Sequence, residues 1–418
     1  MSTTWKLALK PLMIMAASLL LVGCPEPAPP TQPSNPPTDP GTPPTNPPDD
    51  GTCTYILAEN ITVPSRLVNT PSACDYVLED SVYVSSKLVV EPGVVVRAKQ
   101  DASIVVDGGE FLAVGDAQNR IVFEGMNHLS GYWRGIRFND GRESRIEYVD
   151  IKDAGQDTCA IWCDKAGLIL DDVTVSLVHS SVSNSYVNGV VLNEDVVLSA
   201  FGNNRFYGNI WAGLRVNPVH VPLLDADSDY LGEGNPNGKP YIALLNSELV
   251  RGEERRWEER NAPYLIGGYL YVKGGSLTLE PNVEMVFEDE AWLTVQGNGV
   301  LRAVGTATAP IIFRGMVEEP GYWDGITFDG SPWEENRLEY VEIRHSGNVE
   351  SLVNAWGAVR LEYDARVHIS NSVIADNAKY GITCNDPDYN ENTLELGPGN
   401  SFSNNASGDI DPDCGVSP

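Results

Sequence analysis

The chain contains one long sequence pattern twice, and the second copy begins about 190 residues after the first. Four segments of the first copy return in the same order in the second: "LVVEPGV" at 88–94 as "LTLEPNV" at 277–283, "IVFEGM" at 121–126 as "IIFRGM" at 311–316, "GYWRGIRF" at 131–138 as "GYWDGITF" at 321–328, and "RIEYVDIKDAG" at 145–155 as "RLEYVEIRHSG" at 337–347. Such self-similarity is typical of repeat architectures, whose units stack because none can bury its apolar face alone. The sequence therefore predicts a stack of similar units.

Each copy is built from short apolar segments that read as β-strands. Groups of Val, Ile and Leu such as 88–90, 104–106 and 121–123 are separated by Gly, Asp, Asn or Pro, which are turn residues. The best helix candidate, "RGEERRWEER" at 251–260, is better interpreted as a short solvated helix or loop held to the body by Trp257. A β-sandwich array, a propeller and a solenoid of parallel strands are the alternatives. The strands are short and the repeat is far longer than a propeller blade, so the solenoid is favoured.

The motifs "EPG", "AVG", "IVF", "GYWxGIxF" and "RIEYVxI" resemble the right-handed parallel β-helix repeats of pectin-lyase-like proteins, over roughly residues 53–414. The resemblance implies an all-β coil with three short strands per turn and ladders of identical residues inside it. Ten asparagines are candidates for such ladders or for the turns between strands: Asn184, Asn188, Asn203, Asn204, Asn209, Asn371, Asn377, Asn400, Asn404 and Asn405.

The expected organisation has five parts: residues 1–23, 24–52, 53–216, 217–240 and 241–418. The third and fifth parts are the two β-helix repeats, the last of them with a C-terminal cap, and 217–240 is an acidic connector loop. We expect one continuous solenoid with this connector as an insertion. Two coils joined by a linker are the alternative.

The first two parts indicate export and attachment to a membrane. Residues 1–23 have the three-part pattern of a signal peptide, and "LVGC" at 21–24 resembles the bacterial lipobox, which implies a lipidated Cys24. A plain secretory signal is the alternative. Pro25 in place of aspartate favours the outer membrane or cell surface, and the Pro- and Thr-rich segment 24–52 reads as an extended tether.

Six cysteines remain after Cys24, which suits disulfides in an exported chain. Pairing of sequence neighbours is the simplest of the fifteen connectivities. It predicts three bonds: Cys53–Cys74, Cys159–Cys163 and Cys384–Cys414.

The chain carries 28 basic and 58 acidic residues, a formal net charge of −30. Such a surface repels nucleic acids and anionic lipid headgroups. An anionic polysaccharide would need a local basic groove. The acidic excess suits neutral glycans, cations, or simple solubility at a crowded surface.

Two groups of residues are candidates for catalysis. Asp171 and Asp172 form a carboxylate pair like that of pectin-lyase-like hydrolases, but the Gly-His-Gly and Arg-Ile-Lys motifs of those enzymes do not occur, and solvated turn residues are the better interpretation. Lyases of this fold use calcium and a basic residue that takes a proton, roles for which Arg134 and Arg137 are candidates. The second copy carries Asp324 and Thr327 at these positions.

Two further motifs are candidates for ligand binding. Asp225, Asp227 and Asp229 alternate in "DADSDYLGEG", as in the opening of a calcium loop with Glu233 as a further ligand; an acidic, solvated connector is the alternative. Trp133 and Trp323 occupy one motif position in both copies, which favours a buried corner with a bonded indole N–H over a sugar platform.

Together these observations predict a non-catalytic, lipid-anchored surface protein, a rigid β-helix for adhesion or for binding glycan or another envelope component. A polysaccharide lyase or glycoside hydrolase is the alternative, and a structural spacer is a third. An exposed aromatic row would favour glycan binding, whereas carboxylates clustered with Lys, Arg or His on one strand face would favour an enzyme.

Overall fold

The computed structural model describes residues 53–156, 165–250, 254–348, 357–384 and 392–415. All of them belong to one compact unit, Gly51–Pro418, and the other unit, Met1–Asp50, lies outside the described residues. In the described part, no helix is both long and apolar enough to cross a membrane.

Three parallel sheets carry the first copy. Sheet A consists of β1 (Tyr55–Leu57), β3 (Tyr76–Leu78), β6 (Val95–Ala98), β9 (Ile121–Gly125), β11 (Val149–Lys152), β14 (Ser181–Ser183) and β17 (Arg205–Tyr207). Sheet C consists of β2 (Ser65–Leu67), β5 (Lys87–Val90), β8 (Glu110–Val114), the second half of β10 (Gly135–Glu147), β13 (Val173–Val178) and β16 (Val197–Gly202). Sheet B begins with β4 (Val82–Val84), β7 (Ser103–Asp107), the first half of β10, β12 (Ala166–Leu170), β15 (Asn188–Leu192) and β18 (Ala212–Val216).

Sheet B continues through the second copy, where sheets D and E join it. Its further strands are β19 (Lys239–Leu244), β22 (Tyr264–Ile266), β25 (Glu284–Phe287), β28 (Ile311–Gly315), β31 (Val341–Arg344), β34 (Val373–Ala375) and β37 (Ser401–Ser403). Sheet D consists of β20 (Ser247–Val250), β23 (Tyr269–Lys273), β26 (Trp292–Gln296), β29 (Gly325–Asp329), β32 (Gly357–Glu362), β35 (Tyr380–Thr383) and β38 (Gly408–Ile410). Sheet E consists of β21 (Glu254–Trp257), β24 (Ser276–Leu279), β27 (Val300–Val304), β30 (Arg337–Glu339), β33 (Arg366–Ser370) and β36 (Thr393–Leu396).

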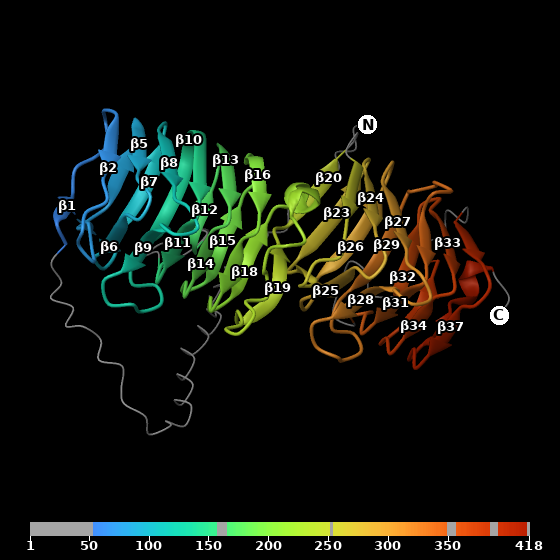
Figure 1. Cartoon of the computed structure of the whole chain (residues 1–418). Coiled ribbons are helices and arrows are strands. Elements are labelled where there is room, and N and C mark those ends of the chain that lie inside the picture. Colours follow the sequence, from blue (N-terminus) through green and yellow to red (C-terminus); the bar gives the residue numbers. More distant parts are fainter. Residues whose placement is uncertain (1–52, 157–164, 251–253, 349–356, 385–391, 416–418) are drawn as a thin grey trace, which may run out of the picture. The chain divides into compact units, whose positions relative to one another are not determined.

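The pairing of these strands is that of a parallel β-helix, which confirms the predicted all-β solenoid. Each strand pairs in parallel with the strand one turn later, as β3 does with β6 and β6 with β9. Figure 1 shows the strands following one another in sequence order, from β1 to β37. Two short 3-10 helices, η1 (Pro218–Leu223) and η2 (Pro412–Cys414), complete the described secondary structure.

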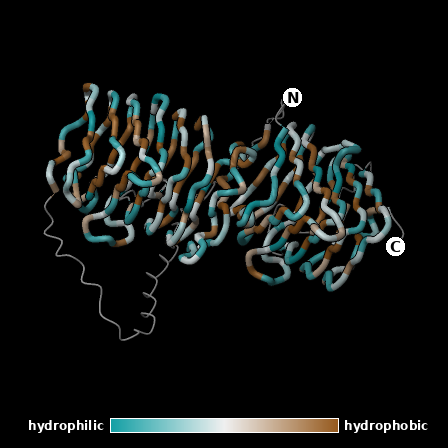
Figure 2. Tube along the Cα trace, in the orientation of Figure 1, coloured by the Kyte–Doolittle hydropathy of each residue, from teal (hydrophilic) through white to brown (hydrophobic). Residues whose placement is uncertain are grey.

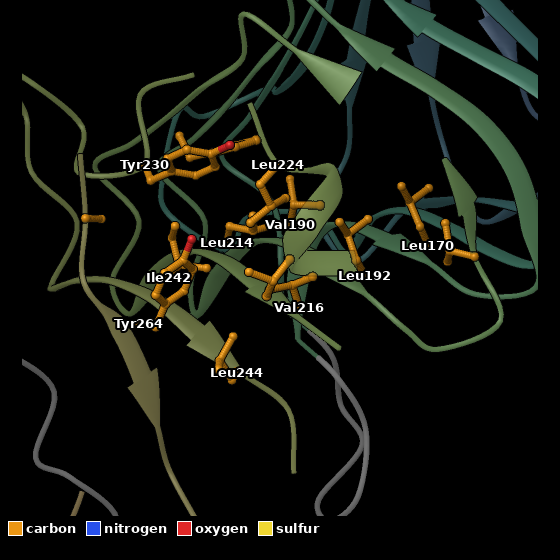
Figure 3. Packing of buried hydrophobic residues seen from close by; sticks show 14 of the residues in the cluster. Leu170, Val190, Leu192, Leu214, Val216, Leu224, Tyr230, Ile242, Leu244 and Tyr264 are labelled. Carbon is orange, nitrogen blue, oxygen red and sulfur yellow. The ribbon is translucent and has the colours of Figure 1, made fainter. Parts of the chain in front are cut away.

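Inward-facing apolar residues form rows that run from turn to turn. In sheet B, Leu170, Leu192, Val216 and Leu244 occupy one register position in four successive strands. Their side chains lie in the buried core, which Figure 3 shows between β12 and β19. Hydrophilic residues alternate with hydrophobic ones along the strands (Figure 2), so each strand has one face in the core and one face outside.

The connector 217–240 and strand β21 each pack a large aromatic side chain into this core. Tyr230 of the connector 217–240 is fully buried among the core residues drawn in Figure 3, and its ring centroid lies 6.0 Å from that of Phe206. Trp257 is also fully buried, as predicted, but it lies on strand β21 instead of a solvated helix or loop. Its indole ring packs beside that of Tyr264, at 5.4 Å between ring centroids.

The predicted asparagine candidates divide into two structural classes. Asn204, Asn209 and Asn377 are buried and bond the backbone or side chains of the neighbouring turns. Asn400 and Asn405 likewise donate to backbone carbonyls of the turn before them. Four others have left-handed backbone in turns: Asn184, Asn203, Asn371 and Asn404. The ten candidates thus include both ladder and turn residues, and Asn188, on β15, donates to the Lys165 carbonyl.

Corresponding strands of the two copies lie in different sheets. The segment "LVV" lies on β5 of sheet C, whereas its repeat "LTL" lies on β24 of sheet E. Likewise β9 of sheet A corresponds to β28 of sheet B, and β7 of sheet B corresponds to β26 of sheet D. The second copy is therefore displaced by one face around the coil.

Two of the three predicted disulfides are present in the structure. Cys53–Cys74 and Cys384–Cys414 join residues whose Cα atoms are 4.6 and 4.9 Å apart. The predicted pair Cys159–Cys163 lies outside the described residues.

Candidate functional site

The two predicted arginines line one cavity on the outer face of sheet B. Arg134 directly precedes β10, and its backbone N–H donates to the Ala102 carbonyl at 2.9 Å. Arg137 lies on β10 between Val105 of β7 and Ile169 of β12 in the parallel register. The cavity has a volume of about 250 Å³, and the described residues that line it are Ser81, Tyr83, Ser103, Val105, Arg134, Gly135, Arg137, Asn139, Gly155, Lys165, Ala166 and Ile169.

Backbone geometry brings the arginines close to the next turn. Gly135 has φ of 100°, and a Cβ atom there would lie 2.4 Å from the Gly167 carbonyl oxygen. Only glycine allows β10 to begin in this position beside β12. The positive φ of Gly135 therefore helps to place Arg134 and Arg137 at the same cavity.

The predicted carboxylate pair does not line this cavity. Asp171 and Asp172 form the turn between β12 and β13, where Asp172 is exposed and has φ of 42°. The Asp172 carbonyl accepts the N–H of Gly141, which joins this turn to the preceding one. The geometry is that of a solvated turn, which was the favoured interpretation of this pair.

The acidic residues of the proposed calcium loop accept hydrogen bonds from backbone N–H groups and from a tyrosine, some of them within the loop itself. The Asp225 carboxylate accepts the N–H of Asn203 at 2.9 Å and the phenol of Tyr230 at 3.2 Å. Burial raises the pKa of the Tyr230 phenol, so it stays a proton donor. The Asp229 carboxylate accepts the N–H groups of Gly232 and Glu233, both at 2.8 Å.

These contacts engage the carboxylates of Asp225 and Asp229 within the protein. In the described ranges, no group of three or more His, Cys, Asp or Glu side chains could hold a metal ion, and Asp225, Asp227, Asp229 and Glu233 are all described. Asp229 is also paired with Arg205, at 3.4 Å. The alternating aspartates therefore bond backbone N–H groups and neighbouring side chains of the connector.

Trp133 and Trp323 are structural residues in both copies. Both are fully buried, and their indole N–H groups donate to the Lys152 and Arg344 carbonyls at 2.7 and 2.8 Å. Trp323 also stacks on Phe287, with ring centroids 3.9 Å apart. The prediction of a buried corner with a bonded indole is confirmed, and these residues are not accessible to a sugar.

A different aromatic group lies on the outer face of sheet D. Tyr269 and Tyr271 point outward from β23, and Trp292 pairs with Tyr269 in the register of β26. The ring centroid of Tyr269 lies 5.4 Å from that of Tyr271 and 5.8 Å from that of Trp292. We call these three residues the aromatic platform; each is half-buried, so part of each ring faces solvent.

The indole N–H of Trp292 has no use in the fold. Its Nε1 atom is shielded from water and has no hydrogen-bond partner among the described residues. A buried donor without an acceptor costs about 1–3 kcal/mol. The aromatic platform therefore combines ring faces with an unsatisfied donor.

The first copy carries other side chains at the platform positions. Ser81 and Ser103 correspond to Tyr269 and Trp292, and the two serine hydroxyls bond each other at 2.8 Å. Sequence reasoning missed the aromatic platform because Tyr269 and Trp292 are 23 residues apart and meet only through the parallel register. Comparing corresponding strands of the two copies would have shown where the side chains differ.

Comparison with known proteins found no matching family model, no matching curated protein and no matching solved structure.

Proposed function

We propose that this protein is a non-catalytic, lipid-anchored surface module that binds glycan through the outer faces of its β-helix. The aromatic platform of Tyr269, Tyr271 and Trp292 carries the proposal. Flat ring faces pack on the C–H faces of pyranose rings, and aromatic side chains offer a large rigid contact at little entropic cost. A sugar hydroxyl would supply the acceptor that the Trp292 N–H lacks.

The side chains around the cavity support binding over catalysis. The described residues that line the cavity of Arg134 and Arg137 include no Asp, Glu or His. A hydrolase needs two carboxyl groups at the scissile bond, and a calcium-dependent lyase needs carboxylate ligands for the metal. The lyase or hydrolase alternative has no comparable support.

Attachment to the membrane follows from the N-terminal sequence. Residues 1–23 are the proposed signal peptide, Cys24 carries the lipid, and 24–52 holds the β-helix away from the outer membrane or cell surface. Cys24→Ser should move the protein from the membrane fraction to the soluble fraction. Membrane retention of this variant would contradict lipidation at this residue.

The glycan proposal is tested with variants that use the residues of the first copy. Tyr269→Ser and Trp292→Ser together place the serines of Ser81 and Ser103 on sheet D, where they are compatible with the same strand positions. The mature protein and this double variant are passed over immobilised neutral polysaccharides, and both retention and polysaccharide chain length are followed.

We expect the mature protein to be retained without shortening the polysaccharide. The double variant should bind about tenfold more weakly or worse, because two ring contacts of about 0.5–1.5 kcal/mol each are removed. Tyr55→Ser, which removes an exposed tyrosine from sheet A, is the matched control and should bind like the parent protein. Equal retention of the double variant, or no retention of the mature protein on any neutral polysaccharide, would contradict the proposal.

A further inference from the structure

Among the described residues that line it, the cavity on sheet B has three cationic side chains and no acidic one. Arg134, Arg137 and Lys165 contribute guanidinium and ammonium groups from β10 and from the segments that lead into β10 and β12. The remaining polar lining consists of serine and tyrosine hydroxyls, the Asn139 amide and backbone. This concentration of positive charge stands in a protein with a formal net charge of −30.

None of the three cations is neutralised within the described residues. Elsewhere on the coil arginines pair with carboxylates, as Arg120 does with Asp150 and Arg145 with Glu147, both at 2.7 Å. Arg137 instead donates from Nε to the amide oxygen of Asn139 at 2.7 Å. No acid in the described ranges lies within salt-bridge distance of Arg134 or Lys165.

Arg134 is the strongest indication of a ligand. Its Nε atom is shielded from solvent and has no hydrogen-bond partner in the described part of the chain. A guanidinium donor that is removed from water and left unbonded is unfavourable, whereas an oxoanion would satisfy it with a charge-assisted bond. The planar fork of arginine fits a carboxylate or a sulfate through two parallel bonds.

The second copy shows the same place without this chemistry. Asp324 and Thr327 replace Arg134 and Arg137, and both are almost fully buried. Arg360 of β32 lies opposite Thr327 of β29 in the parallel register, and it forms a salt bridge with Glu362. The fold therefore does not require the basic residues of the first copy.

We infer that the cavity of Arg134, Arg137 and Lys165 binds the oxoanion of an acidic ligand, a carboxylate or a sulfate group. Arg134 and Arg137 hold the oxygen atoms, and Lys165 adds charge at the rim of the same cavity. The hydroxyls of Ser103 and Tyr83 and the Ile169 side chain line its remaining walls. The inference rests on the proposed function only in taking the anion to be carried by a sugar, since this cavity and the aromatic platform lie on different sheets.

The test measures affinity of the full mature chain for three polymers: polygalacturonate, dextran sulfate and neutral dextran. The double variant Arg134→Asp with Arg137→Thr carries the residues of the second copy and is compared with Arg66→Ala, which removes an exposed cation elsewhere. Circular dichroism and melting temperature establish that each variant is folded. Lys165→Gln is a second variant that leaves the backbone of β10 untouched.

We expect the mature chain to bind one of the two acidic polymers, and the one it binds distinguishes carboxylate from sulfate. The double variant should bind it about thirtyfold more weakly or worse, the effect expected for removing one side of a buried charged contact. Lys165→Gln should weaken binding and reduce its dependence on salt, and Arg66→Ala should change neither.

Unchanged affinity of the folded double variant would overturn the inference, and so would failure of the mature chain to bind either acidic polymer at low salt. The Tyr269→Ser, Trp292→Ser variant separates the two proposals. If it loses neutral glycans and keeps the acidic polymer, both sites exist. If the Arg134→Asp, Arg137→Thr variant loses affinity for the acidic polymer alone, the inferred oxoanion site is supported even if the aromatic platform does not bind neutral glycans.

Discussion

Replacing Asn209 by alanine should destabilise the β-helix through hydrogen bonds alone. The Asn209 side chain is 2% exposed, accepts the Ser185 N–H at 3.0 Å and donates to the Val182 carbonyl at 3.2 Å. In Asn209→Ala the Ser185 N–H becomes a buried donor without an acceptor, at about 1–3 kcal/mol. The bonds from the Asn209 amide to the Val182 carbonyl and to the Asn237 amide oxygen are also lost, each worth about 0.5–1.5 kcal/mol. We expect a total loss of about 2–6 kcal/mol in the free energy of unfolding.

The matched control is Asn203→Gly in a neighbouring corner. Asn203 is exposed with φ of 54°, and its N–H bond to the Asp225 carboxylate does not depend on the side chain. This variant should stay within about 0.5 kcal/mol of the parent protein. Urea unfolding gives the free energies, and hydrogen exchange of the Ser185 amide reports the lost bond directly. Equal costs for the two variants, or an unchanged exchange rate at Ser185 in Asn209→Ala, would refute the internal ladder.

Four further outcomes are expected. Trp323→Ala should lower the free energy of unfolding by about 3–5 kcal/mol, and by about 0.5–1.5 kcal/mol more than Trp133→Ala, because within the described residues Trp323 stacks on Phe287 whereas Trp133 has no stacked ring; equal losses in urea unfolding would count against that contribution. Cys384→Ser should destabilise the C-terminal turns by about 3–4 kcal/mol, seen as faster proteolysis there, and unchanged cleavage would argue against the bond. Burial raises the pKa of Asp150, but hydrogen bonds from Arg120 and Ser181 outweigh this effect and hold the pKa below its usual range. The carboxylate's contribution to stability is therefore complete above the unfolded-state pKa of about 3.9 and disappears as the pH falls through the folded-state pKa. Asp150→Asn should flatten the acid limb of the curve of unfolding free energy against pH, and an unaltered limb would exclude a role for this carboxylate. Addition of a chelator should leave the melting temperature unchanged, whereas a fall would restore the calcium hypothesis.

The coil itself could be predicted because its signals are local and repeated. Short apolar segments between turn residues specify strands, and two copies specify stacking. Trp133 and Trp323 were predicted correctly for the same reason, since one position kept in both copies indicates packing. The strand at Trp257 was missed because charged residues cover the outer face of β21 and hide the alternation.

The arrangement of side chains on the outer faces could not be predicted in the same way. Residues that meet across a parallel ladder are separated by a whole turn of variable length, as Tyr269 and Trp292 are. Arg134 and Arg137 were selected from their spacing, but Lys165 joins them only through the three-dimensional position of β12. The alternating aspartates of 225–229 resembled a cation loop because spacing does not show which donors each carboxylate meets.

If both proposed sites bind polymer, the displacement of the second copy by one face gives the β-helix a valency of two. From β7 to its counterpart β26 the chain passes seven turns, marked on sheet B by β10, β12, β15, β18, β19, β22 and β25, and then one further strand. A whole number of turns would have aligned the aromatic platform with the basic cavity, along a single track for one polymer. With the extra strand the two proposed sites belong to separate tracks, so a molecule with both sites occupied holds two different polymer chains at once.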